Sequence, residues 1–536
     1  MVQHSEPHLV LWQEEKIGNV LQEACNVSGA RTVSISELTS HESISSAVDV
    51  SSSELGEVYA KDSAMIMYTS GSTGTPKGIL LAHEGLRNWV EAALHLFEIG
   101  RDETFLQQTS CSFDMCFVQI FLALCSGGLL CLTPTKLRAD ATFITEAIAT
   151  ENITFTGATP SEYSNWHRYG DHRALSQSLS HWRTALTGGE ATTYATLELF
   201  SSLAGSGDYG NGPRFFNVYG PTETTIGATG TELEYFGDFK SAEIHVGKPL
   251  AGCLVYVMDE RLQPVPVGIQ GEIVIGGAGV ARGYLKNQEL SSERFVPNPL
   301  VPQHYRAKGW TKMHRTGDIG RWREDGALLI EGRKSGDTQI KLRGLRIDLA
   351  EIENSILRES QNTLAQVVVS VRHSTQPSVQ FNEGFLVAHV KFQPGVFPSR
   401  GEQQAFLNEL LARLPLPQYM RPAAAFPVEN LPMMISGKLN RKAVADLPLE
   451  QEGSSSLAYL QRVTDNRPLT KTEARLKDLW EACISDDISK QYAFEPNTDF
   501  FHVGGNSTLL LKLQYDIRRN FDVSLTLLDM FQYSTL

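Results

Sequence analysis

The chain has 536 residues, of which 41% are hydrophobic and 20% charged, a composition typical of soluble globular proteins. This length is too great for one ordinary core and predicts two to four domains. The formal net charge is −14 and no basic block occurs along the chain. Nucleic acid is therefore not expected as the main partner, because binding to phosphates needs clustered Lys and Arg.

The N-terminus and the cysteines both favour a cytoplasmic protein. The segment MVQHSEPHLVLW lacks the basic and apolar regions of a signal peptide. The seven cysteines are scattered, include no CxxC pair and in several cases lie within apolar runs, so we expect reduced, buried thiols. The uncharged stretch 115–135 is interrupted by Ser126-Gly127-Gly128. It predicts a buried helix, a turn and a strand at Leu129–Leu132, and no membrane partner.

Strand-like apolar runs alternate with helical patterns through the first two thirds of the sequence, which predicts α/β layers. These runs are Ala64–Tyr68, Gly78–Leu81, Ile153–Thr156, Thr184–Leu186 and Phe215–Tyr219. From about Ile244 to Ile275, short strands separated by Gly and Pro turns predict a β-rich part.

A hinge, a linker and a small helical domain are predicted in the last third of the chain. Polarity rises over Arg333–Asp348 before a helical pattern that begins near Leu349, so we place a hinge there. Leu449–Ser456 is rich in Ser, Gly and Glu, as linkers are. Thr470–Ile484 shows helical periodicity, and Glu473 lies three residues after its start, the spacing of a capping box.

The strongest local motif is the Gly-, Ser- and Thr-rich segment Tyr68–Gly78, which joins two predicted strands. Its glycines let backbone N–H groups face inward, its hydroxyls add donors and Lys77 adds a positive charge, so it suits phosphate binding. It is not a Walker A loop, because Pro76 precedes Lys77 and Gly78 follows it. The alternative is a flexible Gly/Ser loop. The other phosphate-binding residues expected here are Thr69, Ser70, Gly71, Ser72, Thr73 and Gly74.

Six segments, in order over nearly the whole chain, resemble the core motifs of adenylate-forming enzymes and, among these, of nonribosomal peptide synthetase adenylation domains. They are Tyr68–Gly78, Asn217–Thr225, Gly271–Tyr284, His314–Asp318, Gly332–Glu353 and Ile435–Arg441. The stretches TPSEYSNW and GDTQIKLRGLRIDL are similar to those of fungal polyketide–peptide hybrid synthetases. The resemblance implies an α/β fold with a large adenylate-forming subdomain that includes a β-rich part, followed by a small α+β subdomain.

The resemblance also implies roles that suit the attack of a carboxylate on the α-phosphate of ATP, where two anions must approach each other. Glu223 would hold Mg²⁺, and Thr222 would contact the phosphates. Tyr219 would stack on adenine, while Asp318 and Arg333 would bind the ribose hydroxyls.

Two further positions belong to the small subdomain and its hinge. Lys438 would bridge the substrate carboxylate and the α-phosphate, and Asp337 best matches the hinge aspartate of the family. Rotation about this hinge would remove Lys438 from the site and bring in the loop around Gly344 for thioester formation.

The substrate is expected to be a large apolar or aromatic amino acid, such as Phe, Trp, Tyr or Leu. Asp114 matches the family position that pairs with the α-ammonium group. None of the other matching pocket positions is charged and three are glycines, which leaves volume and no partner for a charged side chain. These positions are Met115, Val118, Gly157, Leu186, Gly188, Val218, Ile226 and Gly227.

A carrier domain is indicated by Asp499–Ser507, which resembles the phosphopantetheine attachment motif, with Ser507 as the modified residue. A serine that opens the helical run Thr508–Leu513 would place its phosphodiester at a helix N-terminus, where an anion is stabilised. A plain Ser N-cap is the alternative. The implied cofactors are ATP, Mg²⁺ and 4′-phosphopantetheine. The implied partners are an amino acid, a phosphopantetheinyl transferase and neighbouring condensation, reductase or release domains.

We therefore expect a large adenylation subdomain at 1–336, a small one at 337–448, a linker at 449–465 and a helical-bundle carrier domain at 466–536. The first two family motifs do not occur, so the large subdomain is expected to lack its first part. The sequence stops at Ser534-Thr535-Leu536, where the last helix of the carrier should start, so the carrier is expected to lack that helix. Two alternatives remain: an acyl-CoA or aryl-CoA ligase of the same superfamily, and an inactive remnant that serves as a carrier or docking module.

Overall fold

The computed structural model describes most of the chain. It leaves out residues 1, 6, 8, 13–30, 35–56, 70–75, 205–211, 238, 242, 335–338, 343–344, 374–383, 394–395, 398, 418–419, 423, 433–438, 440, 448–466, 485–493, 495, 497, 499, 501–506, 522, 524, 526–529 and 531–533. Within the described residues, no helix combines the length and the apolarity that a membrane crossing requires.

A seven-stranded sheet forms the centre of the large N-terminal part, in the order β11-β10-β9-β8-β7-β5-β6. Five strands are parallel: β5 Thr104–Gln107, β6 Leu129–Leu132, β7 Phe155–Ala158, β8 Thr184–Gly188 and β9 Arg214–Tyr219. Two antiparallel strands, β10 Thr229–Leu233 and β11 Lys248–Pro249, continue the sheet at one edge. Parallel strands buried on both faces require helices on both sides, as the alternation of strands and helices predicts.

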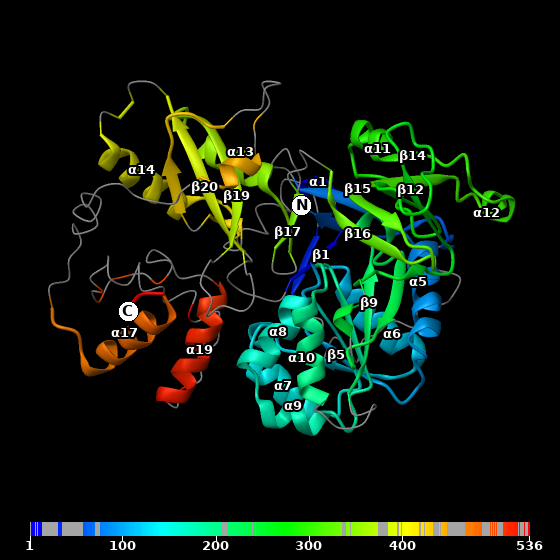
Figure 1. Cartoon of the computed structure of the whole chain (residues 1–536), viewed down its shortest axis with the longest axis horizontal. Helices are drawn as coiled ribbons and strands as arrows, with labels where there is room; N and C mark the ends of the chain where they lie inside the picture. Colours follow the sequence, from blue (N-terminus) through cyan, green and yellow to red (C-terminus); the bar gives the residue numbers. More distant parts are fainter. Residues whose placement is uncertain are drawn as a thin grey trace.

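Each face of this sheet is covered by its own helices, as Figure 1 shows, and has its own hydrophobic core. Successive strand residues point to opposite faces, so Leu106, Ala185 and Phe215 pack with one helical layer, and their neighbours Phe105 and Phe216 with the other. The first layer contains α7 Ala141–Thr150, α8 Pro160–Tyr169, α9 His172–Ser178 and α10 Tyr194–Ala204. The second contains α5 His83–Leu96 and α6 Met115–Ser126.

The predicted β-rich part is a second, mainly antiparallel sheet. Its strands are β12 Cys253–Met258, β13 Gly271–Gly277, β14 Phe295–Pro297, β15 Lys312–Trp322 and β16 Leu328–Arg333. The strands β3 Ser63–Thr69 and β4 Lys77–Ala82 form a hairpin. This hairpin contacts the segment that follows β13, where the Leu80 N–H donates to the carbonyl of Gly283. The short elements are α1 Val2–Ser5, the parallel pair β1 Leu9–Trp12 and β2 Arg31–Ser34, α11 Gln288–Arg294, α12 Gln303–Ala307 and three 3₁₀ turns.

The small α+β part has a separate core. The hairpin β17 Gln339–Leu342 and β18 Leu345–Asp348 occupies the predicted hinge region, and α13 Leu349–Glu359 begins where the sequence indicates. Asp348 caps α13 by accepting from Ala350 N–H, which explains that start. The remaining elements are β19 Leu364–His373, β20 Gly384–Phe392, α14 Arg400–Arg413, β21 Ala424–Pro427 and α15 Arg441–Ala445, with β20 at the centre of the sheet.

Two described helices form the C-terminal part, α17 Lys471–Cys483 and α19 Ser507–Phe521. Thr470 and Glu473 form the predicted capping box of α17. The buried side chains of Trp480, Phe500 and Leu513 belong to one hydrophobic cluster. The predicted linker Leu449–Ser456 lies outside the described residues.

Candidate functional site

Three of the predicted nucleotide-binding residues meet at the boundary between the two sheets. The Tyr219 hydroxyl, at the end of β9, donates to Oδ2 of Asp318 at 2.6 Å. Nη1 of Arg333 donates to the other carboxylate oxygen, Oδ1, at 2.8 Å. Burial raises the pKa of Tyr219 well above its usual value, and the Asp318 charge raises it further, so the phenol stays protonated and donates. Tyr219 and Arg333 thus hold the Asp318 carboxylate from two sides.

Local backbone geometry places Asp318 at this point. The pairing of β15 with β13 is irregular around Thr316–Asp318, where Gly317 adopts the left-handed φ of 76°. Such irregularities re-aim side chains beside functional sites. The Thr316 hydroxyl accepts from the Asp318 N–H at 2.9 Å, and Asp318 lies opposite Arg333 in the β15–β16 register.

Glu223 is a buried carboxylate with a fixed orientation. It lies in the 3₁₀ turn Thr222–Thr224 just after β9 and is only 1% exposed. Its Oε1 accepts a hydrogen bond from the Tyr284 hydroxyl at 3.0 Å. Mg²⁺ prefers oxygen ligands and is commonly held by one or two carboxylates, with waters and substrate phosphates completing the shell. Glu223 fits that role, and the described residues contain no group of three or more metal-binding side chains that suggests another site.

The predicted phosphate-binding loop starts and ends on the β3–β4 hairpin. Thr69 and Lys77 lie opposite each other in its register, so both ends of the loop meet at one place. Gly78 leaves little room for a side chain there, because an added Cβ would lie 3.2 Å from Ile66 and from Leu285. The loop residues Ser70, Gly71, Ser72, Thr73 and Gly74 lie outside the described residues.

The predicted substrate positions gather on the α5–α6 side of the large sheet. Asp114 immediately precedes α6 and is half-buried at the positive end of that helix, which stabilises a carboxylate. Within the strands, Gly157 pairs with Leu186 and Gly188 with Val218. Four of the predicted positions share one hydrophobic cluster, against which Met115 packs: Val118, Leu186, Val218 and Ile226.

Neighbouring side chains occupy the room that the three pocket glycines were expected to leave. A Cβ on Gly157 would lie 3.5 Å from the Met115 sulfur, and one on Gly188 would lie 3.6 Å from the Met115 methyl carbon. A Cβ on Gly227 would approach Cγ1 of Val218 to 2.5 Å and the indole nitrogen of Trp89 to 3.0 Å. The flexible Met115 side chain therefore controls the space beside two of these glycines.

Three features near these positions were missed from the sequence. Trp89 packs against Gly227 from α5, a contact across 138 residues that no motif signals. Nε2 of the buried Gln119 donates to the carbonyl of Gly157. Gln119 lies one turn of α6 after Met115, and this helical spacing was the signal by which the sequence could have identified it. The third missed feature lies in the small subdomain, where Glu353 and Arg441, the last residues of the fifth and sixth motif-like segments, form an ion pair.

Glu353 on α13 and Arg441 on α15 form a bidentate ion pair with both N–O distances at 2.7 Å. Oε1 of Glu353 also accepts the Val369 N–H at 2.8 Å. This pair ties the start of α15 to α13, and Arg441 follows the predicted catalytic residue Lys438 by three positions in the sequence.

The remaining predicted residues cannot be placed in this site. Lys438 and the hinge residue Asp337 lie outside the described residues. Ser507 is the first residue of α19, as predicted, although its side chain is not described.

Comparison with known proteins identifies two families that match this chain. The family described as AMP-binding enzyme matches residues 1–285, and the family described as phosphopantetheine attachment site matches residues 477–536. The hybrid PKS-NRPS synthetase pydA of an Acremonium species is 42% identical over 477 residues, which are 89% of this chain and 11% of that protein. The polyketide synthase-nonribosomal peptide synthetase ffsA of Aspergillus flavipes is 42% identical over 475 residues, with 88% and 11% covered. The chain therefore spans about a ninth of the length of these relatives.

A solved structure has a similar fold. It is that of holo-PA1221, an NRPS protein containing adenylation and PCP domains bound to a vinylsulfonamide inhibitor. The TM-score is 0.63 at 24% sequence identity, with 100% of this chain and 90% of that chain covered.

Proposed function

The chain belongs to the AMP-binding enzyme family and carries a phosphopantetheine attachment site, and we propose that it activates an amino acid with ATP and loads it onto Ser507. Its relatives are fungal hybrid polyketide–peptide synthetases, which confirms the resemblance seen in the motifs. The predicted adenylate-forming fold, the class of adenylating ligase and the use of ATP and phosphopantetheine are confirmed with it. The observation that carries the proposal is the meeting of Tyr219, Asp318 and Arg333, with the buried Glu223 four residues after Tyr219, on a chain with its own carrier.

In the first half-reaction, an oxygen of the substrate carboxylate attacks the α-phosphate of ATP. A phosphorus–oxygen bond forms to give aminoacyl-AMP, and pyrophosphate leaves. Asp318 accepts from the ribose hydroxyls with the lone pairs that Tyr219 and Arg333 leave available. Mg²⁺ on Glu223 supplies charge neutralisation for the phosphates when bound. Thr222, Lys77 and Lys438 add donors to the phosphates and to the attacking carboxylate.

In the second half-reaction, the phosphopantetheine thiol attached to Ser507 attacks the carbonyl of aminoacyl-AMP. A thioester forms, AMP leaves, and the thiol proton passes to solvent or to AMP. We propose that the large subdomain spans 1–336, the small one 337–448, the linker 449–465 and the carrier 466–536. Asp337 is the proposed hinge about which the small subdomain rotates between the conformations for the two half-reactions. The phosphopantetheinyl transferase and neighbouring condensation, reductase or release domains are the proposed protein partners, in the cytoplasm.

The proposed substrate is a large apolar amino acid whose ammonium group pairs with Asp114. The partly buried carboxylate at the N-terminus of α6 favours a cationic partner, and the cluster around Val118, Leu186 and Val218 favours an apolar side chain. Met115 lies over Gly157 and Gly188, so its rotamers set how large the side chain can be. A shortened side chain in Met115→Ala should therefore shift the preference towards larger aromatic amino acids.

Amino-acid-dependent exchange of pyrophosphate into ATP tests the proposal directly. Removing the carboxylate in Asp114→Ala strands the ammonium group at a cost of about 3–5 kcal/mol, so activation should fall by about two to four orders of magnitude. Asp102→Ala, an exposed aspartate of the same sheet region, is the matched control and should leave the exchange unchanged. Intact mass with an active transferase should show one added arm, absent in Ser507→Ala.

The alternatives give different results in the same assays. Exchange that depends on an acid without an amine, and is indifferent to Asp114→Ala, would indicate an acyl-CoA or aryl-CoA ligase. An added arm without exchange for any acid would indicate a chain that serves only as a carrier. A panel in which Asp, Lys or Gly is activated better than every large apolar amino acid would overturn the substrate assignment.

A further inference from the structure

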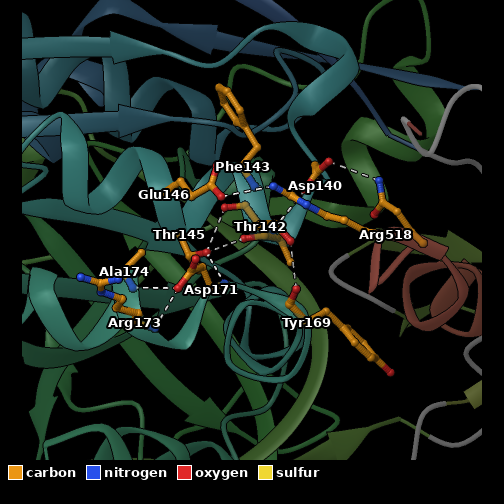
Figure 2. A network of polar contacts seen from close by, with 12 residues as sticks. Asp140, Thr142, Phe143, Thr145, Glu146, Tyr169, Asp171, Arg173, Ala174 and Arg518 are labelled. Carbon is orange, nitrogen blue, oxygen red and sulfur yellow. Dashed lines mark hydrogen bonds and ion pairs between the residues drawn. The ribbon is translucent and has the colours of Figure 1, made fainter. Parts of the chain in front are cut away.

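Helix α19 lies against the outer helical layer of the large sheet through three side chains in its second half, and Figure 2 shows one of them, Arg518, beside Glu146. Nε2 of Gln514 donates to Oδ2 of Asp140 at 3.2 Å, and Nη2 of Arg518 lies 3.3 Å from Oε1 of Glu146. Between them, the ring of Tyr515 lies 6.4 Å from that of Tyr169, centroid to centroid. The contacts join residues more than 340 positions apart and bring the carrier onto the face formed by α7 and the end of α8.

The receiving face is held rigidly by its own hydrogen bonds. Oδ1 of Asp140 accepts from Thr142 N–H and Phe143 N–H, both at 3.0 Å, and thereby caps α7. The Thr142 hydroxyl donates to the carbonyl of Tyr169 at 3.2 Å and ties α7 to the end of α8. Asp140 is only 7% exposed, so one of its oxygens serves the fold and the other meets α19.

The fit between the two surfaces is close. Asp140, Thr142, Tyr169, Gln514, Tyr515, Arg518 and Leu525 enclose a cavity of about 10 Å³, which holds at most one water molecule. Gln514 also donates to the carbonyl of Leu525 at 2.7 Å, so its amide is oriented from the carrier side as well. The charges are complementary, with two carboxylates on α7 and a guanidinium on α19.

We propose that the α7–α8 face is a docking surface for this chain's own carrier, recognised through Gln514, Tyr515 and Arg518. The attachment residue Ser507 lies seven residues before Gln514, about 10 Å along the helix axis, so docking leaves the helix start outside the contact. The half-exposed ion pair of Arg518 with Glu146 adds charge complementarity to this contact. The inference uses the carrier assignment of residues 477–536 but not the adenylation reaction.

Photo-cross-linking in the full chain tests this contact without reference to activity. Tyr515→p-benzoylphenylalanine places a photoreactive aromatic group at the centre of the contact, and peptide mapping should locate the cross-link within residues 140–169. In this background, Arg518→Glu places like charges opposite each other and should lower the cross-link yield about threefold to tenfold. Adding Glu146→Arg restores opposite charges and should restore the yield.

The control variant is Arg519→Glu, the same change of charge at the next position of the helix. Arg519 is exposed and, among the residues that the structure describes, contacts Tyr515 of its own helix, so the yield should stay close to that of the parent chain. Should Arg518→Glu fail to fold, Gln514→Glu opposes Asp140 with a like charge and replaces it. Cross-links outside residues 140–169, cross-links between two molecules, equal losses in both arginine variants, or no restoration by Glu146→Arg would each overturn the proposal.

Discussion

The ion pair between Glu353 and Arg441 provides a sharp test of how the small subdomain holds the start of α15 against α13. Glu353→Gln keeps the side-chain length but removes the charge. The amide can still accept the Val369 N–H with its oxygen, and its NH₂ group then faces the Nη2 donor of Arg441. One charge-assisted hydrogen bond is lost and the guanidinium loses its counter-ion.

The expected cost follows from the geometry and the burial. Hydrogen bonds to charged groups contribute about 1.5–3 kcal/mol, and breaking a buried pair costs about 3–5 kcal/mol. The side chains of Arg441 and Glu353 are 29% and 10% exposed, so solvent takes up part of this loss. We therefore expect about 2–3 kcal/mol, which corresponds to about a 30- to 150-fold change in an opening equilibrium.

Amide hydrogen exchange of Val369 measures this opening directly, because its N–H is bonded to Glu353. Protection should fall by that factor in Glu353→Gln. Glu359→Gln, on the same helix, is the matched control: its pair with Arg358 is 3.4 Å long and exposed, so protection should change by less than about fivefold. Equal effects of the two substitutions would refute the reasoning that the Glu353–Arg441 pair ties α13 to the start of α15.

Three further outcomes are expected. Tyr219→Phe removes a donor to Asp318 and should raise the KM for ATP about tenfold, and an unchanged KM would mean that the hydroxyl does not organise the ribose site. Lys438→Ala should lower adenylate formation about 10²–10³-fold and spare transfer from a preformed adenylate; equal losses would indicate a structural role. Burial, and then the charge of Arg372, lowers the pKa of His389 to about 4. As the pH falls below 6.5, His389 is therefore protonated in the unfolded chain before it is protonated in the folded one. Stability should decrease by about 3 kcal/mol between pH 6.5 and 4, and exchange of β20 amides in His389→Phe should lack this component.

Local features of the fold were predictable because their causes lie within a few residues. The strand Leu129–Leu132 follows from an apolar run bounded by Gly127-Gly128, and the structure has it with the same limits. The start of α17 follows from the capping box of Thr470 and Glu473. These signals depend on short-range hydrogen bonds and backbone preferences, which hold in any tertiary context.

The candidate site was predictable as a set of residue types, and less so as a set of contacts. The motifs named Tyr219, Asp318 and Arg333 for the nucleotide, but the hydrogen bond from Tyr219 to Asp318 joins residues 99 positions apart. It depends on β9 ending beside the irregular stretch of β15. Neither strand's sequence encodes where the other one ends, so the contact emerges only from the packing of two sheets.

The free volume at the substrate positions could not be predicted from the sequence either. A glycine in a motif shows only that this position has no side chain. Whether the space beside it is open depends on the neighbouring side chains. Met115 reaches Gly157 and Gly188 from α6, while Trp89 reaches Gly227 from α5, across 138 residues of chain. Because packed interiors leave few voids, the nearest side chain fills the space beside a core glycine unless a ligand displaces that side chain. Met115 can yield by changing rotamer, whereas the indole of Trp89 is held in a packed cluster, so selectivity for side-chain size should respond to substitution at Met115 before Trp89.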